Sequence, residues 1–66
     1  MSFTLIIKDK TEEKELKGEL TIKELLDELE LSSETIVSKK NGEIVIEDAV
    51  IEEGDKIELV QIIYGG

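Results

Sequence analysis

The sequence predicts an α+β domain: a mixed β-sheet with one helix packed across one face, in the order β-β-α-β-β-β. Three observations support this prediction. One amphipathic helical segment carries its own N-terminal cap, strand-like segments lie on both sides of it, and an Asn-Gly pair marks a hairpin in the second half. The 66 residues suffice for one small domain. We assign residues 1–64 to this domain and residues 65–66 to a flexible Gly-Gly tail.

Two strands are predicted before the helix. Residues 3–8 (FTLIIK) are rich in β-branched and aromatic residues and form the first. Residues 9–12 form a polar turn. Residues 13–20 carry only two large apolar side chains and are predicted to pair back on the first strand as an exposed strand.

The helix begins at Thr21. Thr21 can cap the backbone N–H of Glu24, and the Glu24 side chain can reach back to Thr21, which together make a capping box. Apolar residues follow at i, i+3, i+4 and i+7, on one helical face: Ile22, Leu25, Leu26 and Leu29. We predict that the helix ends near residues 31–33 and must pack on a sheet, because it is too short to persist alone.

Three strands are predicted after the helix. Residues 35–39 form one strand, Asn41-Gly42 supplies a two-residue turn that tolerates positive φ, and residues 43–46 return. Residues 47–51 look irregular, and the turn at residues 53–55 leads into a last strand over residues 56–63. The first and last strands are the most apolar, so we place them side by side at the sheet centre.

The last strand should expose part of its apolar content. Successive side chains alternate faces, and Glu58 should not point at the helix. Ile57 and Leu59 therefore belong to the core, while Val60 and Ile62 lie on the open face. Isolated apolar side chains are common on surfaces. Because these two share a strand with an unusual terminus, a partner surface is an equally good interpretation.

Composition argues for a partner or substrate rather than an enzyme. The chain has no His and no Cys, which removes the common acid–base and thiol mechanisms and the ligands preferred by most metals, so we expect no catalytic residue and no metal site. A net charge of −9, with lysine as the only basic residue type, is unsuited to nucleic acid. No signal peptide or membrane span is visible, so we expect a complete cytoplasmic protein without a membrane partner.

The last two residues are Gly65-Gly66. Two glycines can lie extended in a channel too narrow for side chains. A C-terminal carboxylate there can attack the α-phosphorus of ATP to give an acyl-adenylate, with pyrophosphate leaving. A sulfur donor can displace AMP to give a thiocarboxylate, whereas a lysine would give an isopeptide bond.

Four stretches together resemble the ubiquitin-like β-grasp sulfur carriers: TIKELLDEL (21–29), NGEIV (41–45), EGDKIELVQ (53–61) and YGG (64–66). The chain is most similar to the thiamine-biosynthesis sulfur carriers (ThiS), with the small subunit of molybdopterin synthase (MoaD) as a close relative. The resemblance implies a β-grasp fold over residues 1–64. It also implies an E1-like, ATP- and Mg-dependent enzyme that adenylates and thiolates Gly66, with Gly65 and Gly66 in its channel.

The resemblance further implies a partner interface at Val60, Ile62 and Tyr64. No cofactor is expected to bind the chain itself. The sulfur acceptor would be a thiazole synthase or a synthase of the molybdopterin type, and the sulfur could also be used to thiolate tRNA. Archaeal relatives resemble both sulfur carriers and ubiquitin-like modifiers. A modifier joined to lysines through Gly66 therefore remains the alternative, and a β-grasp binding module without tail chemistry is a third.

Overall fold

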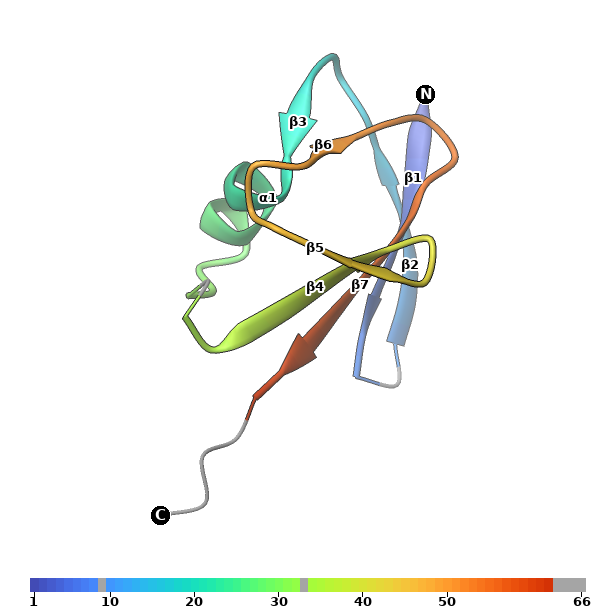
Figure 1. The fold of residues 1–66 in the computed structure, drawn as a ribbon. Coiled ribbons are helices and arrows are strands. Elements are labelled where there is room, and N and C mark those ends of the chain that lie inside the picture. Colours follow the sequence, from blue (N-terminus) through green and yellow to red (C-terminus); the bar gives the residue numbers. More distant parts are fainter. Residues whose placement is uncertain (9, 33, 63–66) are drawn as a thin grey trace.

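The computed structural model describes residues 1–8, 10–32 and 34–62. Along the chain these residues form, in order, β1 Ser2–Ile7, β2 Lys10–Glu15, β3 Leu20–Thr21, α1 Ile22–Glu28, β4 Ile36–Lys40, β5 Glu43–Val45, β6 Val50–Ile51 and β7 Lys56–Gln61. Five strands form one mixed sheet in the order β2-β1-β7-β4-β5, and α1 lies against one face of it (Figure 1). The predicted α+β architecture is confirmed.

The prediction that the first and last strands are neighbours is also confirmed. β1 pairs with β7 in parallel, and β7 pairs with β4 on its other side, so β7 is the central strand. Their alternating apolar side chains point toward α1. The buried core consists of Phe3, Leu5, Leu16, Ile22, Leu25, Leu26, Ile51, Ile57 and Leu59.

The N-terminus of α1 is the predicted capping box. The Thr21 hydroxyl accepts a hydrogen bond from the Glu24 N–H at 3.2 Å, and the Glu24 carboxylate accepts from the Thr21 N–H at 3.1 Å. These bonds satisfy backbone donors that a helix start otherwise leaves unpaired. Three of the four residues on the predicted apolar face are fully buried, and Leu29 is half-buried.

The helix ends earlier than predicted, at Glu28. The Glu30 N–H donates to the Asp27 carbonyl at 3.1 Å, and the Leu31 N–H donates to the Leu26 carbonyl at 2.8 Å. This is the Schellman pattern, and Glu30 occupies its left-handed position with a φ of 59°. Because glycine normally fills that position, the sequence gives no signal for the early stop.

Several strand bounds differ from the prediction by one residue, and two strand assignments differ by more. β2 covers Lys10–Glu15 rather than residues 13–20, although it does pair antiparallel with β1 as expected. Residues 47–51, predicted to be irregular, contain β6, which pairs with β3 in a separate two-stranded sheet. This small sheet brings Ile51 into the core beside the start of α1.

Candidate functional site

Strand β7 and the residue after it carry two of the residues predicted to contact partners, Val60 and Ile62. It is paired on both sides, and its alternation buries Ile57 and Leu59, as predicted. Val60 and Ile62 are each 38% exposed. The Ile62 N–H donates to the Thr35 carbonyl at 2.8 Å, so the regular path of the chain continues one residue past β7.

The apolar surface around Val60 extends onto two neighbouring strands. Val37 of β4 lies directly opposite Val60, on the face that does not contact α1. Ile44 of β5 lies opposite Lys39 on the same face and is 72% exposed. We call Val37, Ile44, Val60 and Ile62 the open-face patch. Val37 and Val60 lie directly opposite each other on neighbouring strands, so the patch is continuous at its centre.

Val37 and Ile44 were not predicted from the sequence to belong to the exposed apolar surface. The signal was present, because the same alternation argument that was applied to the last strand applies to residues 35–39 and 43–46. The register between β4 and β7, which brings Val37 against Val60, could not be obtained from either segment alone.

The predicted tail residues Tyr64, Gly65 and Gly66 lie outside the described residues. The structure therefore fixes the path of the chain only as far as Ile62. Val60 and Ile62 are where the alternation predicts them, and their partner role stays a prediction.

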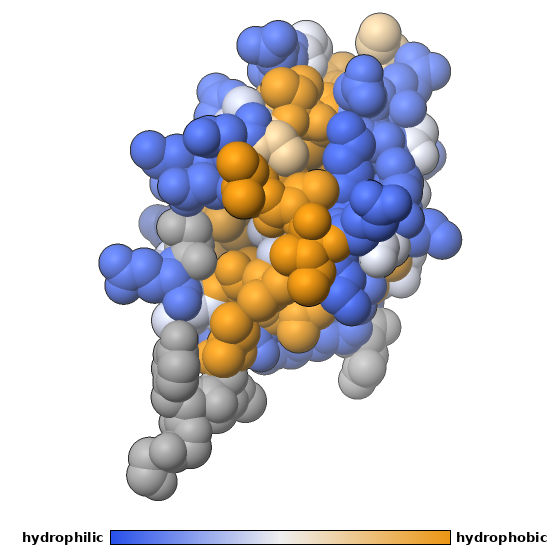
Figure 2. Space-filling model, in the orientation of Figure 1, coloured by the Kyte–Doolittle hydropathy of each residue, from blue (hydrophilic) through white to orange (hydrophobic). Residues whose placement is uncertain are grey.

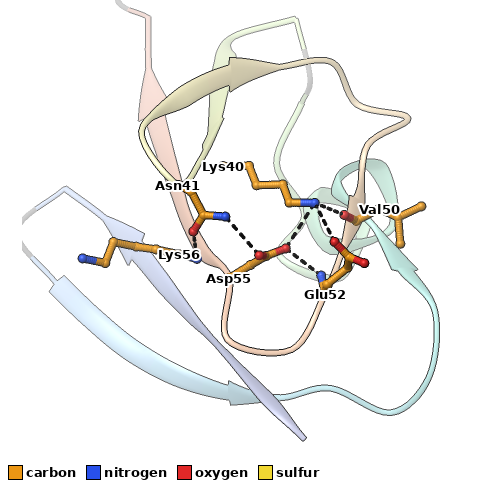
Figure 3. A network of polar contacts seen from close by, with 6 residues as sticks. All are labelled: Lys40, Asn41, Val50, Glu52, Asp55 and Lys56. Atoms are coloured by element: carbon orange, nitrogen blue, oxygen red, sulfur yellow. Dashed lines mark hydrogen bonds and ion pairs between the residues drawn. The ribbon is translucent and has the colours of Figure 1, made fainter.

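A polar network holds the turn that precedes β7 (Figure 3). Its centre is Asp55, which is buried. The Asp55 carboxylate accepts hydrogen bonds from the Glu52 N–H at 2.7 Å and from Asn41 Nδ2 at 3.0 Å, and Lys40 Nζ lies 3.3 Å from it. Asn41 also accepts from the Lys56 N–H at 3.0 Å.

The network and the backbone hydrogen bonds beside it tie three segments to the start of β7. The β4–β5 turn contacts the start of β7 through Asn41, whose N–H also donates to the Lys56 carbonyl at 2.8 Å. Lys40 Nζ donates to the Val50 carbonyl at 2.9 Å, which brings in β6. On the other side, the Thr4 N–H donates to the Asp55 carbonyl at 2.8 Å, which brings in β1. The start of the central strand is therefore fixed from both sides.

The network also shifts the ionisation of its two charged members. Burial alone would raise the pKa of Asp55, but the hydrogen bonds from Glu52, Asn41 and Lys40 outweigh it and hold that pKa below its ordinary value. Burial alone would lower the pKa of Lys40, but the Asp55 and Glu52 carboxylates outweigh it and raise that pKa. Lys40 therefore stays protonated and is unsuited to act as a nucleophile.

The described residues offer no arrangement that would hold a metal ion. Within residues 1–8, 10–32 and 34–62, no three acidic side chains come together as ligands. The helix in this part of the chain is too short and too polar to cross a membrane. The features available for function are thus an apolar open face, a rigidly held central strand, and the segment that follows it.

Comparison with known proteins agrees with this geometry. The family model described as "ThiS family" matches residues 4–66. Among solved structures, SAMP1 from Haloferax volcanii superposes with a TM-score of 0.74 at 20% identity, covering 100% of both chains. The thiamine biosynthesis protein (ThiS) from Geobacter metallireducens superposes with a TM-score of 0.66 at 24% identity, covering 96% of this chain and 99% of that one. At these identities the two superpositions establish a shared β-grasp fold.

Proposed function

The chain belongs to the ThiS family of ubiquitin-like sulfur carriers, and on that premise we propose that Gly66 carries the sulfur as a thiocarboxylate. The observation that carries the proposal is the extent of the family match, which runs through Gly65 and Gly66 to residue 66. A family likeness confined to the β-grasp body would support the fold alone.

The proposed chemistry takes place in a partner's active site. An E1-like enzyme supplies Mg-ATP, and the Gly66 carboxylate attacks the α-phosphorus, forming the acyl-adenylate and releasing pyrophosphate. A sulfur donor then attacks the acyl carbon and AMP leaves, so one C–O bond is exchanged for a C–S bond. The carrier itself contributes the reacting carboxylate and a shape that fits the enzyme, and it binds no cofactor of its own.

The open-face patch supports this proposal as a docking surface. Ile62 stands three residues before Gly65 and Val60 stands five before it, so a partner that takes up Gly65 and Gly66 lies close to these side chains. The patch offers apolar contact area, and the net charge of −9 favours a basic partner surface. We propose a thiazole synthase as the most suitable sulfur acceptor; the match to the ThiS family and the structural likeness to a thiamine biosynthesis protein (ThiS) support this choice.

The experiment is an in vitro thiolation. The chain is incubated with the E1-like enzyme of its host, Mg-ATP and a sulfur source, and its intact mass is measured. We expect the mass to rise by one sulfur-for-oxygen exchange at the C-terminal residue. Deleting Gly66 should abolish the change without lowering the melting temperature, and adding one alanine after Gly66 should do the same.

The same assay separates the alternative function. If a lysine of another protein captures the adenylate, the products are higher-mass conjugates of this chain, which disappear on deletion of Gly66. An unchanged mass in the presence of an enzyme that is active on another carrier would refute both versions of the proposal.

A further inference from the structure

Strand β5 forms a free edge of the five-stranded sheet. Among the described residues it pairs with β4 alone, through Lys40–Glu43, Lys39–Ile44 and Ser38–Val45. The Asn41-Gly42 turn makes Lys40–Glu43 the first hydrogen-bonded pair, and antiparallel pairs alternate between bonded and non-bonded. Lys39–Ile44 is therefore a non-bonded pair. The backbone N–H and C=O of Ile44 point away from β4, toward the free edge.

The next backbone donor to consider along this edge is that of Ile46, the first residue after β5. Its carbonyl accepts from the Ala49 N–H at 3.1 Å, while its N–H has no hydrogen-bond partner anywhere in the described part of the chain. Within the described residues, the Ile44 N–H and C=O and the Ile46 N–H are thus unpaired, and an added strand supplies partners for such groups.

Apolar side chains flank this edge on both sides. Ile44 lies on the open face, opposite Lys39. Ile46 follows the end of β5, where the strand alternation no longer holds, and lines a groove on the helix side. Both side chains are 72% exposed. Beside Ile46 runs a groove of about 340 Å³ lined by Leu26, Ile36, Ser38, Ile46 and Glu47. Figure 2 shows hydrophobic residues gathered in a stripe along the side of the molecule on which β5 is seen in Figure 1, with hydrophilic residues on either side.

The charged residues of β5 and of the loop after it are acidic, and Lys39 of β4, opposite Ile44, forms no ion pair with them within the described residues. Glu43, Glu47 and Asp48 are exposed, and none of the three is in an ion pair with another described residue. The nearby Lys40 is held by Asp55 and Glu52 and cannot neutralise them. An edge that offers backbone hydrogen bonds, apolar flanks and uncompensated carboxylates fits a segment with alternating apolar and basic residues.

From these observations we propose that the β5 edge binds an extended, basic and apolar segment of a partner protein by strand addition. The added strand forms hydrogen bonds to Ile44 and to the Ile46 N–H. Its apolar side chains contact Ile46 and the groove, and its lysine or arginine side chains pair with Glu43, Glu47 and Asp48. The inference is independent of the tail chemistry, because it involves no residue after Asp48.

A second copy of the chain is a poorer occupant. Two β5 strands paired about Ile44 would gather six like charges, three from each copy, and each chain carries a net charge of −9. Like charges facing one another at a strand pair are destabilising. Charges on an edge strand are a common means of preventing such self-pairing.

The test is an NMR titration of the isotope-labelled chain with a capped hexapeptide in which Lys and Val alternate. We expect the largest amide shifts between Glu43 and Glu47, slowed solvent exchange of the Ile44 and Ile46 amides, and a Kd below about 1 mM. The matched control is the same hexapeptide with Glu in place of each Lys, which should bind at least about tenfold more weakly. Added salt should weaken the Lys peptide.

Two variants test the backbone contribution. Ile44→Pro removes the outward N–H but no bond to β4, and edge strands tolerate proline at such positions. It should weaken peptide binding about tenfold relative to Ile44→Ala, which loses the side chain and keeps the N–H. Thermal melts establish that both variants fold. If Ile44→Pro unfolds, Ile46→Pro, compared with Ile46→Ala, tests the N–H of Ile46.

Three outcomes would overturn the inference. The first is equal binding of the two peptides, and the second is shifts confined to Val60 and Ile62. The third is a concentration-dependent dimer whose interface contains the Ile44 amide in the absence of peptide, which would assign the edge to a second copy.

Discussion

Replacing Asp55 with asparagine should destabilise the fold strongly at neutral pH, because the carboxylate is the hub of the network before β7. It accepts from the Glu52 N–H and from Asn41 Nδ2 and pairs with Lys40. An asparagine oxygen can keep one of these contacts, but its amide would then face another donor. Losing two charge-assisted hydrogen bonds at about 1.5–3 kcal/mol each gives an expected loss of roughly 3 kcal/mol or more.

That loss is large for a domain of this size. At about 0.05–0.15 kcal/mol per residue, the whole chain is stable by roughly 3–10 kcal/mol. A loss of 3 kcal/mol corresponds to a drop in Tm of about 12–24 °C for a small domain. Urea unfolding at pH 7 gives the free-energy difference directly, provided that the slope of the transition is unchanged.

The pH dependence provides the sharper test. Because the folded-state pKa of Asp55 is lowered, its stabilisation is fully present above the ordinary carboxyl pKa of about 3.9 and is lost as the pH falls through the folded-state value. The stability difference between the natural chain and Asp55→Asn should therefore shrink as the pH falls below about 4. Other carboxylates titrate in both proteins and cancel. A difference under about 0.5 kcal/mol at pH 7, or one that persists undiminished into strong acid, would refute the reasoning.

Three further substitutions test separate features. Glu30→Gly should raise stability by about 0.5–1 kcal/mol in thermal melts, because glycine adopts the left-handed φ of 59° without strain; a loss would show that the Glu30 side chain is needed. Gly42→Ala should cost about 1 kcal/mol through its φ of 90° alone, since an added Cβ meets nothing within 4 Å, and a D-alanine there should restore stability. Val60→Asp should weaken binding of the activating enzyme about tenfold or more with little change in Tm. Thr11→Asp makes the same charge change on the edge strand β2 and should leave that binding unchanged. A large drop in Tm for Val60→Asp would contradict the assignment of Val60 to the exposed face.

The features that were predicted correctly from sequence are those set by neighbours in the chain. The Thr21–Glu24 capping box spans three residues, and the Asn41-Gly42 turn depends on two residues that both adopt positive φ. The division of the last strand into buried Ile57 and Leu59 and exposed Val60 follows from its alternation and from the position of Glu58.

The features that were missed depend on contacts between distant segments. β3 and β6 have two residues each and form only because α1 and the loop after β5 bring them together. Asp55 looks like a solvated turn residue in the sequence, yet it is buried because its donors come from residues 40, 41 and 52. The pairing of Val37 with Val60 likewise depends on the register between two strands that are far apart in sequence.

The Asp55 network fixes the positions of both the open-face patch and the β5 edge. Asn41 is bonded to Lys56 and Asp55, so the β4–β5 hairpin is held at a fixed register against the start of β7. That register places Val37 against Val60 on the open face, and it leaves the Ile44 backbone at the free edge. A disturbance at Asp55 therefore reaches the open-face patch and the β5 edge together, although Asp55 belongs to neither. If a variant of the network loses partner binding, the loss therefore reports a displaced β4–β5 hairpin and does not identify the surface that the partner contacts. Only substitutions that leave the network intact can assign binding to one surface. Val60→Asp tests the open-face patch, and Ile44→Pro tests the β5 edge when it is compared with Ile44→Ala, because both variants lose the Ile44 side chain and only the first loses the N–H.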